Sequence, residues 1–293
     1  MRSRAEPISD RFGQAESPRI DPRSGELLWI DLISGCFHTG RFADGAVITT
    51  RSVRVGPHIG AAAPLVEHGA GWIVAAGRDL VHVTDEGCLS PLVAGITPDA
   101  TRTLNDGVCA PDGSFWVGSQ THPRRPAGAL YRIDPSLSVT RVLDAVTVSN
   151  GIVFDATGET MYYVDTLPHR RLERFAVHAG GLSGRVTVSE CSGGNPDGIA
   201  LDDDGDVWVA MWDAAEVRRL TSDGRTAQIV PLPVSRPTAV ALWDGALLVT
   251  TARLPGEELA GRILAVDVGR SAAPTPAFAA TIAGGAGVEG TNT

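Results

Sequence analysis

The stretch that decides the fold is Asp197-Gly-Ile-Ala-Leu-Asp-Asp-Asp-Gly-Asp-Val-Trp-Val-Ala210. It reads as a short apolar strand, a polar turn that contains a glycine, and a second strand of aromatic and β-branched residues. The same phrase occurs six times, at residues 16–31, 63–76, 105–118, 150–165, 197–210 and 237–251. Its turn glycine recurs every 40 to 47 residues, which leaves room for about four short strands in each repeat.

An all-β chain with a repeat of this length is typical of a β-propeller in which each repeat forms one blade. Two separate β-sandwiches would not require one phrase at even spacing. The sequence therefore predicts a six-bladed β-propeller, with residues 1–293 forming a single domain and about 15–270 its ordered core. Residues 271–293, rich in Ala, Gly, Pro and Thr, are expected either to complete the closing blade or to form a flexible tail.

Composition limits the partners of the protein. The chain has 25 Lys and Arg against 34 Asp and Glu, a formal net charge of −9, so we expect no nucleic-acid partner and no membrane partner. The apolar stretches have the length of strands, and the N-terminal residues do not resemble a secretory signal. Four irregularly spaced cysteines, Cys36, Cys88, Cys109 and Cys191, form no CxxC motif. They indicate reduced, buried thiols in a cytoplasmic protein.

Polar side chains recur where the first strand of a repeat begins. This strand lines the central channel of a propeller, and one end of the channel is the usual place for a ligand. Eight or nine residues before the turn glycine, four of the six repeats carry an acid or an amide: Glu16, Asn105, Asn150 and Asp197. If strands rather than turns are matched, Asp106 takes the level of Asn150, so Asn105, Asp106 or both are expected to face the channel. Taken singly, Asn105-Asp-Gly107, Asn150-Gly151 and Asp197-Gly198 also suit turns.

Together these residues favour a metal site. Two carboxylates and two amide oxygens at one channel mouth suit a hard cation such as Ca²⁺, Mg²⁺ or Mn²⁺. Without a cation the two acids would repel each other. The seven histidines show no HxH or HExxH spacing, so a histidine-ligated zinc site is not indicated. The sequence also contains no GxSxG motif and no P-loop.

A set of short phrases, in this order, resembles the family of senescence marker protein 30, gluconolactonase and luciferin-regenerating enzyme. The phrases are Ala15-Glu-Ser-Pro18, Leu28-Trp-Ile-Asp31, Leu104-Asn-Asp-Gly107, Phe115-Trp-Val-Gly118, Ser149-Asn-Gly151, Tyr162-Tyr-Val-Asp165, Pro196-Asp-Gly198, Val207-Trp-Val-Ala210 and Thr250-Thr-Ala-Arg253. The resemblance extends from residue 15 to about residue 267. It implies a six-bladed propeller that holds one divalent cation at the channel mouth, with Ca²⁺ the first expectation and Zn²⁺, Mn²⁺, Mg²⁺ and Fe²⁺ as alternatives.

The resemblance also implies roles for single residues. Glu16, Asn150 and Asp197 are implied as the metal ligands, and Asn105 as a residue near the metal on the substrate side. The implied activity is hydrolysis of a cyclic ester, most often a sugar-acid lactone, although the family also contains arylesterases and organophosphate hydrolases. As a hypothesis, Asp197 is the catalytic residue that takes a proton from water and passes it to the leaving alkoxide. Asn105 would then hydrogen-bond the ring oxygen or a hydroxyl of the substrate.

Two departures from the family pattern concern the substrate. Sugar-lactone members commonly carry Arg two residues before the asparagine, where this chain has Thr103, with Arg102 one step further back. Since a one-residue shift on a strand turns a side chain to the opposite face, the direction of Arg102 decides whether it reaches the substrate. The phrase Val117-Gly-Ser-Gln120 stands where the family usually has a small residue followed by Gly-Thr-Met. The acidic residue that often follows this phrase in the family is absent between Gln120 and Arg125. His122 is expected to lie either on the channel or in a surface loop.

Arg102, Thr103, Gln120 and His122 therefore join Asn105 as candidate substrate-binding residues. We expect a divalent-metal-dependent hydrolase that opens a lactone, of which an aldonolactone is the type expected, as a monomer or weak homo-oligomer. Its partner would be a small-molecule lactone or ester. Two alternatives remain at this point: a non-catalytic propeller that binds a small ligand or a protein, and a biosynthetic enzyme that uses the same metal site for another reaction.

Overall fold

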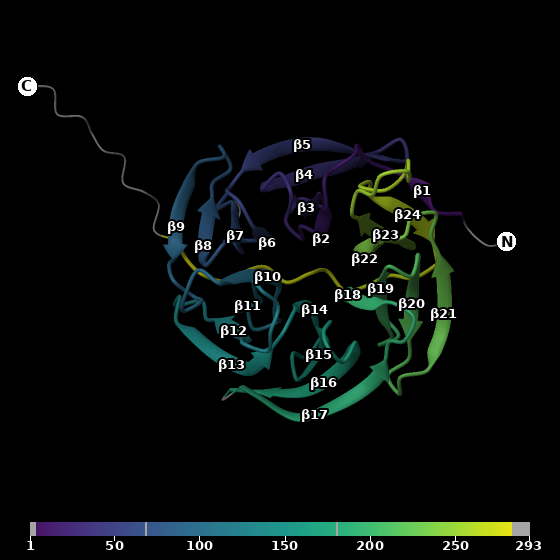
Figure 1. Cartoon of the computed structure of the whole chain (residues 1–293). Helices are drawn as coiled ribbons and strands as arrows, with labels where there is room; N and C mark the ends of the chain where they lie inside the picture. Colours follow the sequence, from purple (N-terminus) through teal and green to yellow (C-terminus); the bar gives the residue numbers. More distant parts are fainter. Residues whose placement is uncertain (1–3, 68, 180, 283–293) are drawn as a thin grey trace, which may run out of the picture.

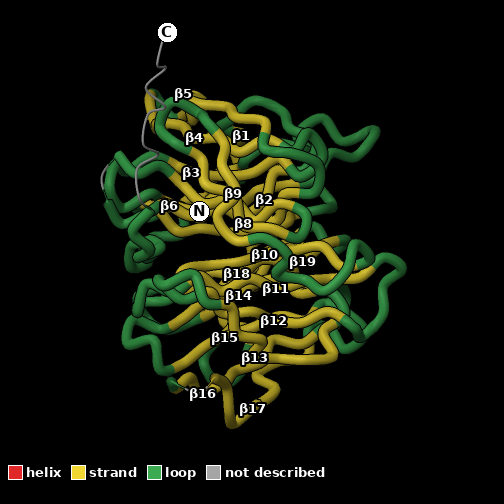
Figure 2. The backbone as a smooth tube through the Cα atoms, turned by 90° about the vertical axis from the view of Figure 1, so that its left-hand side faces the viewer, coloured by secondary structure: helices red, strands yellow, loops and turns green. Residues whose placement is uncertain are grey.

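The repeats form the blades of a six-bladed β-propeller, as the sequence predicts (Figure 1). The computed structural model describes residues 4–67, 69–179 and 181–282. Each blade is a four-stranded sheet whose strands follow one another from the channel outward. Figure 2 shows only strands and loops, and the described residues contain no helix that could cross a membrane.

Twenty-four strands build the six blades. Blade 1 contains β2 (Ala15–Ile20), β3 (Leu27–Asp31), β4 (Cys36–Ala43) and β5 (Ala46–Arg54). Blade 2 contains β6 (Ile59–Pro64), β7 (Trp72–Ala76), β8 (Asp79–Val83) and β9 (Leu89–Val93), and blade 3 contains β10 (Arg102–Cys109), β11 (Phe115–Thr121), β12 (Gly128–Ile133) and β13 (Val139–Val146). Blade 4 contains β14 (Ser149–Phe154), β15 (Thr160–Asp165), β16 (Arg171–His178) and β17 (Gly181–Glu190). Blade 5 contains β18 (Asn195–Leu201), β19 (Val207–Trp212), β20 (Glu216–Leu220) and β21 (Thr226–Pro231), and blade 6 contains β22 (Pro237–Trp243), β23 (Ala246–Thr251), β24 (Leu264–Asp267) and β1 (Glu6–Pro7).

The N-terminal segment closes the last blade. Strand β1 is its outer strand, with Glu6 opposite Ala265 and Pro7 opposite Leu264 of β24. The expectation that the C-terminal segment completes this blade does not hold for residues 271–282, which add no strand to it. Residues 283–293 lie outside the described part of the chain. Because β1 leads directly into blade 1, its pairing with β24 ties blade 6 to blade 1 and so closes the ring.

Every innermost strand carries one extra residue relative to its neighbour. These β-bulges lie between Glu16 and Arg19, Ile59 and Ala61, Leu104 and Gly107, Ser149 and Ile152, Pro196 and Ile199, and Pro237 and Ala239. A bulge bends its strand and changes the direction of the side chains around it. In blades 1, 3, 4 and 5 the bulges coincide with the acid and amide positions that the sequence repeats at one level.

The core consists of six apolar clusters, each shared by two adjacent blades. Trp29, Trp116 and Trp208, which recur on the second strand of their blades, are fully buried in three of them. All four cysteines are free. The expectation that they are buried is right for Cys109 and Cys191 and wrong for Cys88, which lies exposed at the β8–β9 turn, and for the half-buried Cys36.

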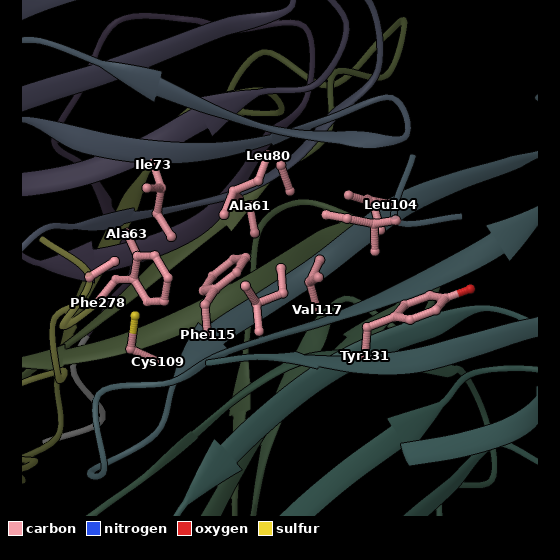
Figure 3. Packing of buried hydrophobic residues seen from close by; sticks show 14 of the residues in the cluster. Ala61, Ala63, Ile73, Leu80, Leu104, Cys109, Phe115, Val117, Tyr131 and Phe278 are labelled. Carbon is pink, nitrogen blue, oxygen red and sulfur yellow. The ribbon is translucent and has the colours of Figure 1, made fainter. Parts of the chain in front are cut away.

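The C-terminal segment crosses the channel instead of joining a blade, and in Figure 1 it runs as a yellow trace between β10 and β18. The Phe278 N–H donates to Pro64 O at 2.8 Å, and Phe278 O accepts from the Val66 N–H at 2.9 Å. The Phe278 side chain is fully buried in the cluster between blades 2 and 3, edge-on to Phe115 (Figure 3). Residues 272–276 cover a cavity of about 730 Å³ at the end of the channel where the innermost strands finish, which we call the far end.

Candidate active site at the open channel mouth

A second cavity, of about 530 Å³, lies at the opposite end of the channel, which we call the open mouth. The first residues of the innermost strands line it, whereas their last residues line the cavity under the C-terminal segment. Seven of the predicted site residues meet here from distant parts of the chain: Glu16, Thr103, Asn105, Gln120, His122, Asn150 and Asp197.

The three predicted metal ligands come from three blades. Glu16 lies on β2, Asn150 on β14 and Asp197 on β18, each at the bulge of its innermost strand. Glu16 Oε1 accepts a hydrogen bond from Gln14 Nε2 at 2.9 Å. The Asp197 carboxylate is 8% exposed and opens on the cavity. The arrangement therefore brings two carboxylates and a carboxamide to one cavity.

Arg102 is the one candidate that the structure does not bring to this cavity. Its Nε donates to Ala127 O at 2.7 Å, and its guanidinium forms an ion pair with Asp99. Because neighbouring residues of β10 point to opposite faces, Thr103 lines the cavity and Arg102 points away from it. The structure therefore does not place Arg102 among the residues that line the cavity, and the one-residue displacement seen in the sequence is the reason.

The bulge in β10 answers which of Asn105 and Asp106 faces the channel. Asn105 lines the open mouth, whereas Asp106 lies below it, where its Oδ1 accepts from Ser17 Oγ at 3.3 Å. Arg19 Nη2 lies 3.5 Å from the same oxygen, and both side chains of this ion pair are nearly buried, at 11% and 15% exposure. Burial raises the pKa of Asp106, and the Arg19 charge opposes that rise.

A chain of side-chain hydrogen bonds crosses three blades behind the predicted ligands. Gln120 Nε2 donates to Asn105 Oδ1 at 3.2 Å, and Asn105 Nδ2 donates to Asn150 Oδ1 at 2.8 Å. Asn150 Nδ2 donates to Thr166 Oγ1 at 2.6 Å, and Thr166 in turn donates to Pro196 O at 2.8 Å. Because a backbone carbonyl can only accept, it sets the direction of the whole chain and the orientation of the Asn150 amide.

The carboxylates of the site are destabilised as anions. Burial, opposed by the Gln14 hydrogen bond and reinforced by Asp106, raises the pKa of Glu16 to about 8. Burial and the neighbouring charges of Glu16 and Asp106 raise the pKa of Asp197 well above its usual range. Two buried acids that line one cavity therefore favour a proton or a cation between them.

The donor set fits a hard divalent cation. Among the described residues, no three His, Cys, Asp or Glu side chains are arranged to hold a metal ion. The candidate set instead combines the carboxylates of Glu16 and Asp197 with the amide oxygen of Asn150, which are oxygen ligands of the kind that Ca²⁺, Mg²⁺ and Mn²⁺ prefer. Asn150 Oδ1 accepts one hydrogen bond from Asn105 and retains a second lone pair for a cation.

Several lining residues were not predicted from the sequence. They are Gln14, Leu32, His58, Ile59, Leu104, Arg124, Val148, Thr166, Leu167, Asn195, Trp212 and Arg236. Some could have been found from the ends of the second strands, because Gln120 lies opposite Thr103 and Trp212 lies opposite Asn195 in the sheet register. Others, such as His58, Arg124 and Arg236, lie in connections whose course the repeat does not determine.

Comparisons with known proteins agree with the fold. The family model described as "SMP-30/Gluconolactonase/LRE-like region" matches residues 14–253. A 6-deoxy-6-sulfogluconolactonase from Pseudomonas putida is 32% identical over 280 residues, which cover 90% of this chain and 94% of the relative. An L-arabinolactonase from Azospirillum brasilense is 30% identical over 207 residues, 64% of this chain and 68% of the relative. The solved structure of a calcium-binding regucalcin from Agrobacterium tumefaciens has the same fold, with a TM-score of 0.82 at 23% identity over 92% of this chain and 95% of that one.

Proposed function

The chain belongs to the SMP-30/gluconolactonase/LRE-like family, and from this premise we propose that it is a divalent-metal-dependent hydrolase that opens a sugar-acid lactone. One observation carries the proposal: Glu16, Asn150 and Asp197 converge from three blades on the cavity at the open mouth. The names of two relatives, a sulfogluconolactonase and an arabinolactonase, support the class of substrate.

Glu16, Asn150 and Asp197 would hold the cation, which would act as a Lewis acid toward the lactone carbonyl. To serve as ligands, Glu16 and Asp197 must be ionised, although burial alone favours their protonated forms. Asp197 opens on the cavity, where the lactone and the attacking water would lie. Asp197 is therefore suited to take a proton from water as its oxygen adds to the carbonyl carbon, and to return the proton to the ring oxygen as the ester bond breaks.

The hydrogen bonds refine the role expected for Asn105. Both of its amide hydrogens are used, one by Ser149 O at 2.7 Å and one by Asn150 Oδ1. Asn105 therefore has no hydrogen left to donate to the ring oxygen of a substrate. Its Oδ1, which takes one hydrogen bond from Gln120, can still accept another from a substrate hydroxyl. Asn105 thus positions Asn150 and offers the substrate an acceptor.

The test is lactone hydrolysis with and without metal. Purified protein is treated with a chelator, then reloaded with Ca²⁺, Zn²⁺, Mn²⁺ or Mg²⁺, and assayed on a panel of aldono-lactones by proton release. We expect turnover to disappear on chelation and to return with at least one cation, and Glu16→Gln to lose the response that the surface control Glu159→Gln keeps. Hydrolysis that survives chelation would contradict the proposed metal dependence. A metal-reloaded protein that hydrolyses none of the lactones would contradict the proposed lactonase activity.

A further inference from the structure

The open mouth carries positive charge that the proposed chemistry does not use. Arg124 lies in the loop after β11, is exposed, and lines the cavity. Within the described part of the chain it has no hydrogen-bond or ion-pair partner. Its charge nevertheless acts on the site, because it opposes the rise in the pKa of Asp197. Arg124 is therefore an unpaired cation within electrostatic reach of the proposed catalytic carboxylate.

A second arginine lies on the other side of the mouth. Arg236 directly precedes β22 and lines the cavity together with Trp212. Its guanidinium lies 5.0 Å from the centroid of the Trp212 ring, and its Nε donates to Asp213 at 3.0 Å. Only Nε of Arg236 is engaged by Asp213, and within the described structure its terminal nitrogens make no hydrogen bond, so they can bind a ligand. Arg124 follows β11 of blade 3 and Arg236 precedes β22 of blade 6, so two separate connections supply the arginines that line this cavity.

The acids of the cavity do not balance these charges. Glu16 and Asp197 are its only acidic lining residues in the described structure, and the cation that we propose would neutralise both. Gln120 and the residues up to Arg125 contain no acid that could pair with Arg124. With the proposed cation bound and Arg236 paired with Asp213, the charge of Arg124 remains unbalanced, in a protein whose formal net charge is −9.

On the premise of the proposed lactonase activity, we propose that the substrate is a lactone that carries an anionic group remote from its ester, and that Arg124 and Arg236 bind this group. The ester carbonyl must reach Asp197, which is buried, whereas Arg124 is exposed, so the end of the sugar remote from the ester would lie beside the arginines. Guanidinium groups form charge-assisted, often paired hydrogen bonds with carboxylates, sulfonates and phosphates. The substrate class is thus an acidic sugar lactone with a carboxylate, sulfonate or phosphate at its terminal carbon.

The experiment uses lactones that share one ring and differ only at the terminal carbon, which carries a hydroxyl, a carboxylate, a sulfonate or a phosphate. We measure kcat/KM for the metal-loaded wild type, Arg124→Ala, Arg236→Ala and the control Arg125→Ala. The control substitution Arg125→Ala removes a positive charge from the same loop, but Arg125 does not line the cavity. We expect wild type to prefer at least one anionic lactone by about 10- to 100-fold, and Arg124→Ala to lose most of that preference, mainly through KM, as expected for lost charge-assisted hydrogen bonds.

The hydroxyl lactone should be hydrolysed about equally by wild type and Arg125→Ala, and Arg124→Ala and Arg236→Ala should lose much less kcat/KM on it than on the preferred anionic lactone. The preference should also shrink as the salt concentration rises from about 0.05 M to about 0.5 M, since salt screens exposed charges. Equal kcat/KM for the neutral and all the anionic lactones, or equal losses in Arg124→Ala and Arg125→Ala, would overturn the inference and leave the lactonase intact.

Calorimetric binding separates the two proposals if no lactone is hydrolysed. Binding of an anionic but not the neutral lactone, weakened in Arg124→Ala and not in Arg125→Ala, would support the anion site while the proposed lactonase activity fails. Absence of binding to every anionic lactone would overturn the anion site.

Discussion

Asn105 Nδ2 lies 2.8 Å from Asn150 Oδ1, and this hydrogen bond joins blade 3 to a predicted metal ligand of blade 4. The bond orients the Asn150 amide from one side, while Thr166 accepts from its nitrogen on the other. A ligand that is held at both ends of its amide loses little freedom when it binds a cation. Groups of this kind, one step removed from the metal, set its affinity as well as the reaction rate.

Replacement of Asn105 tests this relationship. Asn105→Ala removes the hydrogen bond to Asn150 and should lower both cation affinity and kcat/KM by about 10-fold. Cation affinity is measured by calorimetry on the chelator-treated protein. Asn195→Ala is the matched control, because Asn195 lines the same cavity but accepts its hydrogen bond from Arg170. Loss of turnover in Asn105→Ala at unchanged cation affinity would show that Asn105 acts on the substrate alone.

Replacement of Asp197 should cost far more. Asp197→Asn removes both an anionic ligand and the proposed proton acceptor, so we expect kcat to fall by at least about 100-fold. The variant should fold, because an amide replaces a buried carboxylate that burial already disfavours. Thermal unfolding checks the fold, and single-turnover assays at saturating cation measure the chemical step. Small, similar losses in Asp197→Asn and Asn105→Ala would contradict the roles assigned to both.

The stability of the metal-free protein should depend on pH through Glu16. The folded state raises the pKa of Glu16 from its ordinary value of 4.5 to about 8. Between these values the folded protein keeps a proton that the unfolded chain has lost, so this group makes Tm fall as pH rises through the window. Glu16→Gln should flatten the slope, and the exposed Glu159→Gln should not. Added Ca²⁺ should raise Tm more at pH 8 than at pH 6, because ligands must be deprotonated to bind it.

The fold could be predicted because one phrase recurs in six copies with a glycine at one position. The structure confirms the reason for that glycine: Gly25, Gly71, Gly113, Gly158, Gly205 and Gly245 all have φ between 72° and 83°, a region that other residues rarely adopt. The closure of the ring could not be predicted in the same way. Strand β1 has only two residues and shows no periodicity in the sequence. Its pairing with β24 is decided by which part of the N-terminal segment reaches the free edge of blade 6 in the folded ring.

The site was predictable only where the repeat fixes its residues. Glu16, Asn105, Asn150 and Asp197 stand at one level of the innermost strands, and the sequence places them together for that reason. The bulge at this level inserts one residue, which is why sequence alignment alone left Asn105 and Asp106 as alternatives. Arg124 and Arg236 come from loops between strands. Only the three-dimensional course of these loops decides that both side chains line the cavity.

The C-terminal segment should contribute strongly to stability. Phe278 is fully buried between blades 2 and 3, so Phe278→Ala should lower the free energy of unfolding by about 3 kcal/mol. Pro274→Ala, in the part that spans the far cavity, is the control and should change it by less than about 1 kcal/mol. Urea denaturation measures both. Because the open mouth lies at the opposite end of the channel, kcat/KM of the folded Phe278→Ala protein should stay near the wild-type value.

The ion pair between Arg19 and Asp106 should hold the channel together below the site. Burial raises the pKa of Asp106, and the facing guanidinium opposes that rise. Arg19→Met removes the cation that faces the buried Asp106 carboxylate and should lower the free energy of unfolding by about 3 kcal/mol. Adding Asp106→Asn should recover most of that loss, since no buried charge then remains. Arg41→Met is the control: Arg41 pairs with Glu26 at the surface, 74% exposed, so its loss should cost less than about 1 kcal/mol. If urea denaturation finds equal costs for Arg19→Met and Arg41→Met, the buried pair does not stabilise the channel.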